Sequence, residues 1–215
     1  NEITGSEVIG VDLNFSLFHS GHKYINNQSI HLVIASLYHL PFKESQFDLV
    51  YSQGVIHHTY STHDALNNIS RYCNNNGWLF IWVYAIEDHL AKKGFLGLRY
   101  RVQYYIELLL RPIISRLPSV VRGVLLYFIS ILLHPLILLT QNRKKREIYA
   151  LNNSNMNIRD WLTPRYAHKH TFNEVIEWFE DLGFSYELHS PSKYRELFGK
   201  PLWGIGILGK KLETK

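Results

Sequence analysis

The sequence predicts an α/β fold: a Rossmann-like doubly wound sheet, mostly parallel, with an antiparallel strand near its C-terminal end. Four short, nearly continuous apolar runs are rich in Val, Ile and aromatic residues, a pattern typical of strands covered on both faces. Segments with helical spacing or turn residues separate these runs. Such an alternation indicates parallel βαβ units, in which consecutive strands are joined by crossover segments.

The first part of the chain, residues 1–87, contains these runs. We expect the strands at residues 8–12, 31–36, 47–52 and 77–84. Apolar residues recur at helical spacing over residues 63–72, which predicts a helix there. CNNNG at residues 73–77 predicts a turn, since asparagine tolerates left-handed backbone. Cys73, at the end of this helix, is interpreted as a core residue rather than a reactive thiol.

The second part, residues 88–149, has a different texture. Residues 98–117 show the spacing of an amphipathic helix, which we expect to be interrupted near Pro112. Residues 120–140 are almost wholly apolar, but Arg122 lies near the start and His134-Pro135 is expected to break the segment. This pattern favours a helical lid, or an element on a membrane surface, over a membrane span.

The third part, residues 150–215, returns to an α/β pattern. Thr171 and Glu174 have the spacing of a capping box, and Gly183 is placed to end the helix that follows. Strands are expected at residues 184–189 and 202–211. Residues 1–87 and 150–215 would therefore form one Rossmann-like domain, with residues 88–149 inserted as a lid.

Composition excludes several classes of protein. A single cysteine excludes an internal disulfide framework, and no signal-peptide pattern stands at the start, so we expect a cytoplasmic protein. The net charge of +5 comes partly from the basic cluster at residues 143–146, which follows an apolar run. That position suits anionic lipid headgroups or a solvated helix end better than nucleic acid. The 12 histidines show no closed-site spacing with Cys or carboxylates, so no metal site is expected.

The order and spacing of four segments resemble a known family. They are VIGVD at residues 8–12, ASLYHLPF at 35–42, FDLVYSQGVIHHT at 47–59 and ALNNISRYCNNNGWLFI at 65–81. Together they resemble the class I S-adenosylmethionine-dependent methyltransferases, in the branch of the ubiquinone and menaquinone biosynthesis enzymes. The resemblance implies an enzyme that transfers a methyl group from S-adenosylmethionine to a small acceptor. The apolar lid with a basic end suits a lipophilic acceptor, such as a quinone precursor, a polyketide or a lipid.

The resemblance also implies cofactor-binding residues. Asp12, followed by Leu13, matches the acidic residue that holds the cofactor ribose, and its place at a strand end is suited to that contact independently. Ser36 falls where the family has an aspartate near the adenine, with Leu37 beside it, although both could be plain loop residues. Gln53 matches a position that lines the methionine part of the cofactor.

Two groups of residues are candidates for the chemistry. His57 and His58 follow the third strand, where a histidine could accept a proton from a hydroxyl substrate or could anchor the loop. Tyr166, His168 and His170 come after the lid, where the family tends to place substrate-facing groups, and local packing is the alternative. Methyl transfer needs alignment more than covalent catalysis, so no nucleophile dyad is required.

The start of the chain departs from the family. The family's first strand and its glycine-rich turn are not found before Val8, so we expect a fragment whose complete form has further residues upstream. Two other classes stay open. One is a catalytically silent methyltransferase-like module that associates with a partner, or with membrane through residues 95–146. The other is a nicotinamide-dependent dehydrogenase, although no Tyr-x-x-x-Lys pair is recognisable.

Overall fold

A computed structural model of the chain describes residues 5–24, 27–86, 94–139, 151–189 and 204–213. The first half contains β1 (Val8–Asp12), α1 (Ser16–Gly21), β2 (Ile30–Ile34), β3 (Phe47–Gln53), α2 (Thr62–Ser70) and β4 (Cys73–Val83). The helices α4 (Gly94–Ile114), α5 (Ser119–Leu139) and α7 (Leu151–Leu162) follow, and α8 (Phe172–Asp181), β5 (Phe184–His189) and β6 (Ile205–Lys211) complete the order. All six strand predictions are confirmed within a few residues.

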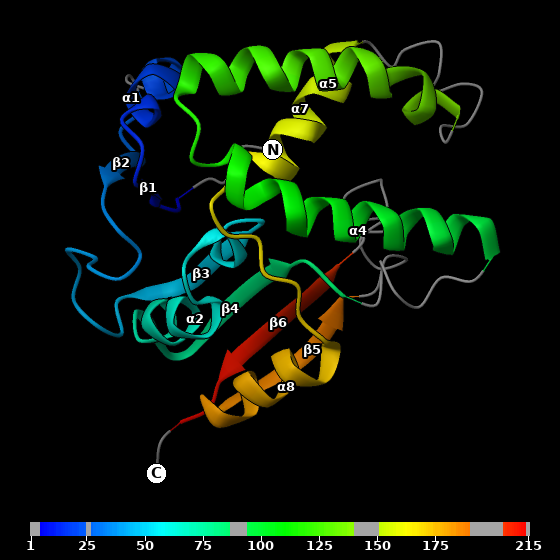
Figure 1. Ribbon diagram of the computed structural model, residues 1–215. Coiled ribbons are helices and arrows are strands. Elements are labelled where there is room, and N and C mark those ends of the chain that lie inside the picture. Colours follow the sequence, from blue (N-terminus) through cyan, green and yellow to red (C-terminus); the bar gives the residue numbers. More distant parts are fainter. Residues whose placement is uncertain (1–4, 25–26, 87–93, 140–150, 190–203, 214–215) are drawn as a thin grey trace.

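The strands form two parallel pairs and an antiparallel extension. β1 pairs in parallel with β2, and β3 pairs in parallel with β4. β6 is antiparallel to both β4 and β5, so the larger sheet has the order β3-β4-β6-β5 (Figure 1). The predicted mixed, Rossmann-like sheet with an antiparallel strand at its C-terminal end is therefore confirmed.

The β1–β2 pair is separate from the larger sheet. Among the described residues β1 pairs only with β2, and β3 pairs only with β4, so the edges of β1 and β3 have no strand partner. The loop after β2 connects the two parts instead. Its Tyr38 hydroxyl donates to the carbonyl of Ser61 at 2.9 Å, and the Asn68 amide donates to the carbonyl of Leu37. The loop thereby packs against α2 beside the larger sheet.

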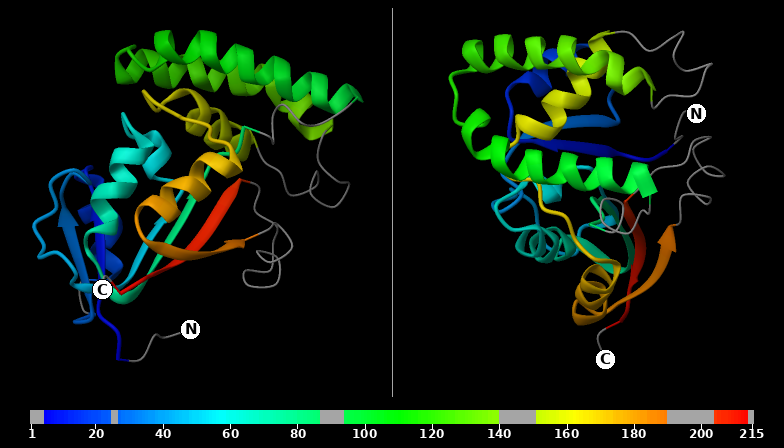
Figure 2. Two further views of the ribbon diagram at one scale, coloured as in Figure 1. Left: turned by 90° about the horizontal axis from the view of Figure 1, so that it is seen from below. Right: turned by 45° about the vertical axis from the view of Figure 1, so that its right-hand side comes forward.

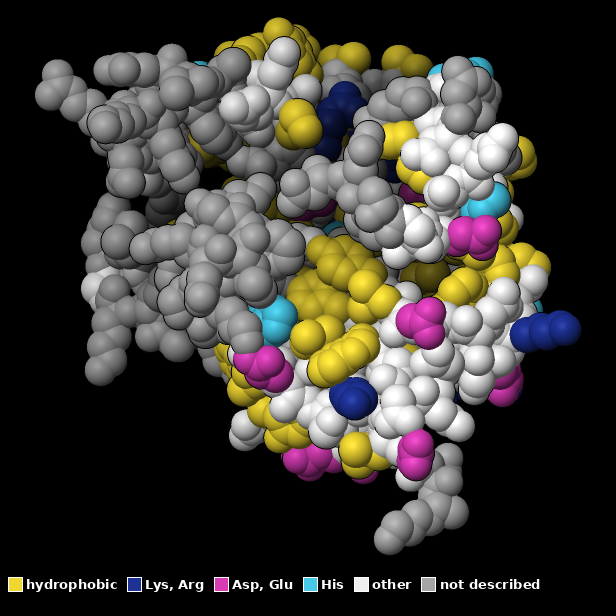
Figure 3. Space-filling model, turned by 180° about the vertical axis from the view of Figure 1, so that it is seen from behind, with side chains coloured by type: hydrophobic (Ala, Val, Ile, Leu, Met, Phe, Trp, Pro, Cys, Tyr) yellow, Lys and Arg dark blue, Asp and Glu magenta, His cyan; other side chains and the backbone are white. Residues whose placement is uncertain are grey.

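The main core lies on one face of the larger sheet. α2 and α8 cover this face, and their apolar residues pack on the strands. The helix period expected for α2 is confirmed, because Ala65, Leu66 and Ile69 are buried there. The opposite face differs from the prediction that the strands are covered on both sides. Leu49, Tyr51 and Trp78 remain about half exposed, and hydrophobic side chains form a patch on that side (Figure 3).

Local backbone signals explain how several elements begin and end. The Thr171 side chain accepts from the Glu174 amide and the Glu174 carboxylate accepts from the Thr171 amide, so the predicted capping box is present. Gly183 ends this helical segment at a φ of 73°. CNNNG departs from the predicted turn, because β4 already starts at Cys73, yet Asn76 has the left-handed φ of 62°. Cys73 is fully buried, as expected of a core residue.

A helical layer made of α4, α5 and α7 lies beside the sheets (Figures 1 and 2). Both α4 and α5 pack against α7, around a small apolar cluster that includes Leu126 and Ile158. The interruption expected near Pro112 is found slightly later, since α4 includes Pro112 and ends at Ile114, whereas α5 continues through Pro135, where a break was expected. None of the helices in the described part of the chain combines the length and the apolarity that a bilayer span requires.

The reason α5 survives its proline is tertiary packing. A proline inside a helix removes one backbone hydrogen bond and costs about 3 kcal/mol. Next to Pro135, the His134 ring lies 2.9 Å from the Ser154 hydroxyl of α7, and Ile137 is buried in the shared cluster. These contacts hold the last turns of α5 in place and offset the local cost.

Candidate functional site

The carboxyl ends of β1 and β2 bring two predicted cofactor residues together. The strands are parallel and in register from Val8 to Asp12, and the amide of Ala35 donates to the Asp12 carbonyl at 3.1 Å. Asp12 is exposed, and its Oδ1 accepts from the Asn14 amide at 2.9 Å. Ser36 follows one residue after Ala35, and its Oγ accepts from the Tyr38 amide at 3.2 Å. An exposed carboxylate and a hydroxyl thus stand close together at one strand edge.

The other predicted cofactor residues lie around this edge. Leu13 is 71% exposed directly after Asp12, and Leu37 packs partly into the main core. Gln53 ends β3 in the larger sheet, where its side chain is exposed and accepts from the Tyr51 hydroxyl. The structure therefore places Asp12, Leu13, Ser36 and Leu37 at the ends of one strand pair and Gln53 at the end of another. Among the described residues, no strand pairing joins β1 and β2 to β3.

His57 and His58 lie in a short 3-10 helix directly after β3, and they have different environments. The His58 ring donates through Nδ1 to the carbonyl of Tyr166 at 2.9 Å, which ties the loop to the segment before α8. His57 is fully buried. The centroid of its ring lies 4.0 Å from that of the Tyr84 ring and 4.2 Å from that of the His58 ring. Burial lowers the pKa of His57 to about 2, so this ring is neutral near pH 7.

Tyr166, His168 and His170 form the other side of this loop. His168 Nε2 lies 3.0 Å from the Thr59 carbonyl, and the His168 amide donates to the His57 carbonyl at 2.9 Å. His170 Nε2 lies 2.8 Å from the Thr62 hydroxyl, and its Nδ1 lies 3.1 Å from Glu174. Tyr166 is 37% exposed and stacks on His168. These contacts anchor the loop after β3, and the substrate-facing role stays a prediction.

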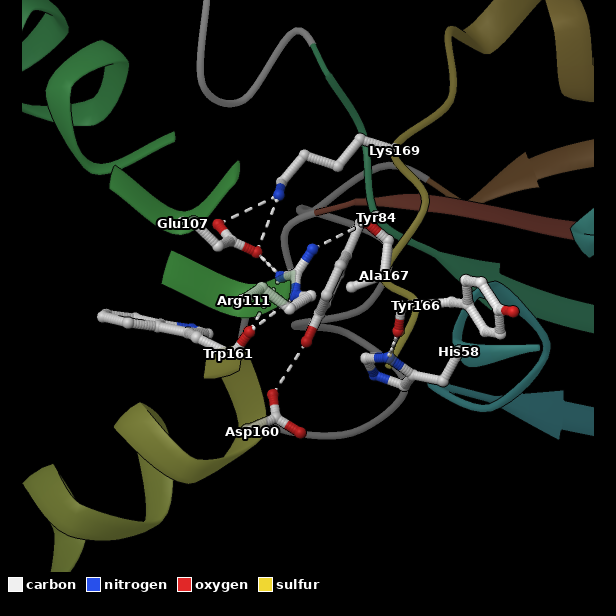
Figure 4. A network of polar contacts seen from close by, with 9 residues as sticks. All are labelled: His58, Tyr84, Glu107, Arg111, Asp160, Trp161, Tyr166, Ala167 and Lys169. Atoms are coloured by element: carbon white, nitrogen blue, oxygen red, sulfur yellow. Dashed lines mark hydrogen bonds and ion pairs between the residues drawn. The ribbon is translucent and has the colours of Figure 1, made fainter. Parts of the chain in front are cut away.

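A buried polar network connects α4 to this segment (Figure 4). The Glu107 carboxylate on α4 lies 3.0 Å from Lys169 Nζ through each oxygen, and it also pairs with Arg111 one turn further on. Arg111 donates to the carbonyl of Trp161 at 2.8 Å and to that of Ala167 at 3.3 Å. The side chains of Glu107 and Lys169 are each only 5% exposed. Three charged groups therefore hold α4 against the chain segment that leads into α8.

Tyr84 extends the network to the end of β4. Its hydroxyl donates to Asp160 Oδ2 at 2.7 Å, and burial together with this carboxylate raises the Tyr84 pKa. Burial, and secondarily the Arg111 cation, lowers the pKa of Lys169 to about 8. A cavity of about 70 Å³ lies between the side chains of these elements, lined by Tyr84, Glu107, Trp161 and Lys169.

Several polar atoms near the carboxyl ends of β3 and β4 have no hydrogen-bond partner within the described structure. They are Ser52 Oγ, both ring nitrogens of His57 and Trp82 Nε1. The Trp82 ring lies 6.0 Å from the His57 ring and packs edge-on against Tyr84, so the atoms belong to one region. Buried polar groups are normally paired, and each orphaned one indicates a bound water, a ligand or a functional group. Here they surround the end of the sheet where the predicted site lies.

Sequence reasoning missed the network altogether. Glu107 and Lys169 are 62 residues apart in the chain, and neither belongs to a recognisable motif. One signal was present: Glu107 is the only acid between residues 94 and 139, in a helix that otherwise carries arginines, and Arg111 follows at i+4. A lone acid on an apolar helix indicates a buried ion pair, although the sequence does not name its distant partner.

The fold and the site define a class. Parallel strands joined by crossovers, an acidic residue at the carboxyl end of β1 and an antiparallel β6 between β4 and β5 form a Rossmann-like arrangement, as the sequence predicted. A helical layer beside the carboxyl ends of β3 and β4 completes the architecture.

Comparisons with known proteins agree with this class. Residues 2–81 match a family model described as a methyltransferase domain. The YcgJ protein of Bacillus subtilis shares the fold at a TM-score of 0.53 and 14% identity, over 97% of this chain and 84% of that protein. An S-adenosylmethionine-dependent methyltransferase of Methanosarcina mazei shares the fold at a TM-score of 0.53 and 14% identity, over 97% of this chain and 83% of that protein. No curated protein matches the chain.

The matched segment contains Asp12, Ser36, Gln53 and both loop histidines, which are the positions that the resemblance singled out. The family-model match over residues 2–81 bears out the predicted resemblance to the S-adenosylmethionine-dependent methyltransferases for that segment, and the solved structures share the fold. The cofactor of this class is S-adenosylmethionine. The narrower resemblance to the ubiquinone and menaquinone branch stays a prediction, as do the roles of the individual site residues.

Proposed function

We propose that this protein transfers the methyl group of S-adenosylmethionine to a small, lipophilic acceptor that reaches the cavity beneath α4. The observation that carries the proposal is the group of unpaired polar atoms on Ser52, His57 and Trp82, next to the cavity at the ends of β3 and β4. Cofactor and acceptor must meet where these strands end, because ligands of doubly wound sheets bind outside the carboxyl ends.

The residues near β1 fit the polar half of the cofactor. The exposed Asp12 carboxylate is suited to accept hydrogen bonds from ribose hydroxyls, and Ser36 adds a hydroxyl close by. The backbone of Leu37 is held by Asn68, which fixes the loop position. When bound, S-adenosylmethionine supplies an electrophilic methyl group, so the protein mainly orients the acceptor and excludes water.

The residues beneath α4 fit the acceptor. Tyr84 and Trp161 supply aromatic surface to the cavity, while Glu107 and Lys169 supply charge. Because the cavity has a volume of only about 70 Å³, it would hold the reacting end of an acceptor, and the remainder of the acceptor molecule would lie along α4. His58 is the stronger candidate for a base, because its Nδ1 donates to Tyr166 and its other nitrogen is then free of a proton. His57, with a pKa of about 2, is a weak base.

Calorimetric titration of the chain with S-adenosylmethionine tests the cofactor half of the proposal. We expect binding, and we expect Asp12→Asn to weaken it by about tenfold, because a charge-assisted hydrogen bond contributes roughly 1.5 kcal/mol or more. Asp181→Asn, an exposed carboxylate at the end of α8, is the matched control and should bind normally. Absence of binding would instead favour the catalytically silent module.

Transfer of a labelled methyl group to a panel of alkylated phenols, quinols and fatty acids tests the acceptor half. His58→Gln should lower turnover by about a hundredfold if His58 accepts the proton, within the usual range for general bases. His58→Gln with unchanged turnover would leave His58 as a loop anchor. Cofactor binding by the variant, measured in parallel, separates a catalytic loss from a misplaced loop.

A further inference from the structure

We propose that the outer faces of α4 and α5 dock on the surface of an anionic lipid bilayer. This inference goes beyond the proposed methyl transfer and does not depend on it. The opposite faces of these helices are accounted for, since they pack against α7 and against the segment that leads into α8. The outer faces carry large apolar side chains that stay exposed, because no other described element covers them.

On α4 most of the exposed apolar residues form one stripe, with Leu108 and Leu110 exposed on either side of it. The spacing of the stripe residues follows the helical period, so they lie on a single face opposite Glu107 and Arg111. Each is between 48% and 72% exposed: Leu98, Val102, Tyr105, Ile106, Leu109 and Ile113. An amphipathic helix normally turns such a stripe toward a core. Here the buried face carries the ion-pair network, and the apolar stripe is turned outward.

On α5 the same inversion occurs. The face that carries Leu126, Ser130 and Ile137 is buried against α7. Apolar side chains that are between 41% and 76% exposed lie away from it: Val120, Val124, Phe128, Ile131 and Leu132. Figures 1 and 2 show α4 and α5 at the periphery of the molecule, with the sheets to one side of them. Monomeric soluble proteins rarely expose contiguous apolar patches larger than a few hundred Å², so this surface indicates a partner.

Charge identifies the kind of partner. Residues 94–139 contain Arg99, Arg101, Arg111, Arg116 and Arg122 but only one acid, Glu107. Glu107 is 4% exposed and is neutralised within the network, so it adds no negative charge to the surface. Arg101 and Arg116 are exposed beside the apolar stripes. A basic and apolar helix surface without acids is suited to the boundary between anionic headgroups and acyl chains.

The same surface could also bind a second copy of this chain. Two such copies would bring their exposed arginines together without acids to neutralise them, which opposes a face-to-face dimer. A bilayer with anionic headgroups satisfies the apolar residues and the arginines together. The experiment therefore uses vesicles as the probe and measures the oligomeric state in parallel.

Flotation of the full chain with vesicles tests the proposal. We expect binding to vesicles of phosphatidylcholine with phosphatidylglycerol, and binding weaker by about tenfold or more to phosphatidylcholine alone. The double variant Leu109→Glu with Leu132→Glu should lose at least about tenfold in binding, since it places charge within both apolar faces. Arg101→Glu with Arg116→Glu should lose a similar factor on anionic vesicles only.

Matched controls lie elsewhere on the surface. Leu212→Glu changes a side chain that is 54% exposed after β6, and Lys43→Glu reverses an exposed charge before β3, so both should bind vesicles as the unchanged chain does. Circular dichroism and urea unfolding confirm that each variant is folded. Absence of binding to anionic vesicles, binding of either double variant equal to that of the unchanged chain, or a stable dimer formed through this surface would overturn the proposal.

Discussion

The sheet core and the helical layer use the same residue types in opposite ways. In the sheet core the apolar side chains point inward, and Leu79, Ile81 and Val83 of β4 are all fully buried. In the helical layer many apolar side chains point outward, while Glu107, Arg111 and Lys169 are buried. Hydrophobic composition alone therefore does not report where a core lies in this protein.

The difference follows from how each region is covered. The strands of the larger sheet have α2 and α8 against one face, so alternate residues reach a shared core. Within the described residues, α5 packs mainly against α7, and α4 packs against α7 and the chain before α8, so each helix buries a single narrow face. Residues beyond that face stay exposed whatever their chemistry, and a surface rather than a second core results.

The largest expected effect compares two phenylalanines. Phe179→Ala removes a fully buried ring that packs on Phe184, and we expect it to lower the free energy of unfolding by about 4 kcal/mol. Phe128→Ala removes a ring of α5 that is 59% exposed, and the change should stay within about 0.5 kcal/mol. Urea unfolding measures both. Similar losses for the two variants would erase the distinction between the regions.

The next effect tests the buried charges of the helical layer. Glu107→Gln leaves the Arg111 and Lys169 cations without their carboxylate, and we expect a loss of about 3 kcal/mol in the free energy of unfolding. Glu44→Gln, which breaks the exposed pair with Arg71, is the control and should cost less than about 1 kcal/mol. Equal and small losses would show that the network contributes little to holding α4.

A third effect depends on pH and belongs to the loop between the regions. Burial lowers the pKa of His57 from 6.5 to about 2 in the folded chain, so between these values only the unfolded chain holds the proton. The stabilising contribution of the neutral ring is complete above pH 6.5 and is lost as the pH falls below it. From pH 6.5 to pH 5 the free energy of unfolding should fall by about 2 kcal/mol through this group.

His57→Phe isolates that contribution. The variant should show a shallower fall in stability between pH 6.5 and pH 5, measured by urea unfolding at several pH values, because its ring takes up no proton. His39→Gln, at an exposed position, should keep the slope of the unchanged chain. An unchanged slope in His57→Phe would mean that the ring is not buried as described.

The smallest effect tests whether the helices of the sheet core also depend on local capping. Thr171→Ala removes the hydroxyl that accepts from the Glu174 amide at 3.2 Å, and it should cost about 1 kcal/mol in thermal unfolding. Thr171→Ser keeps a hydroxyl and should restore most of the loss. If neither substitution changes the thermal stability, α8 is stabilised by burial alone.

The strands were predictable because their evidence is local. Continuous apolar runs at residues 8–12 and 47–52 predicted β1 and β3 with little error, and the Thr171 box predicted the start of α8. The predictions failed where packing overrode a local rule. Pro135 does not break α5, because His134 and Ile137 are held against α7.

The candidate site was only partly predictable. Motif order placed Asp12, Gln53 and the loop histidines at strand ends, since a strand's carboxyl end is a local property. The cavity beneath α4 was not foreseen, because it needs Tyr84, Glu107, Trp161 and Lys169 from four separate segments. No spacing along the chain records that these side chains meet.

By itself, the amino-acid sequence determined the strands, the capped helix, the class of fold and the family that it resembles. These properties depend on period, turn chemistry and the order of neighbouring residues, which a linear chain records directly. Only the tertiary structure decided which apolar faces are buried, which charges are enclosed and where the cavity lies. The physical reason is that burial depends on what packs against a residue, and the partners of α4 come from distant parts of the chain, as the contact between Glu107 and Lys169 shows.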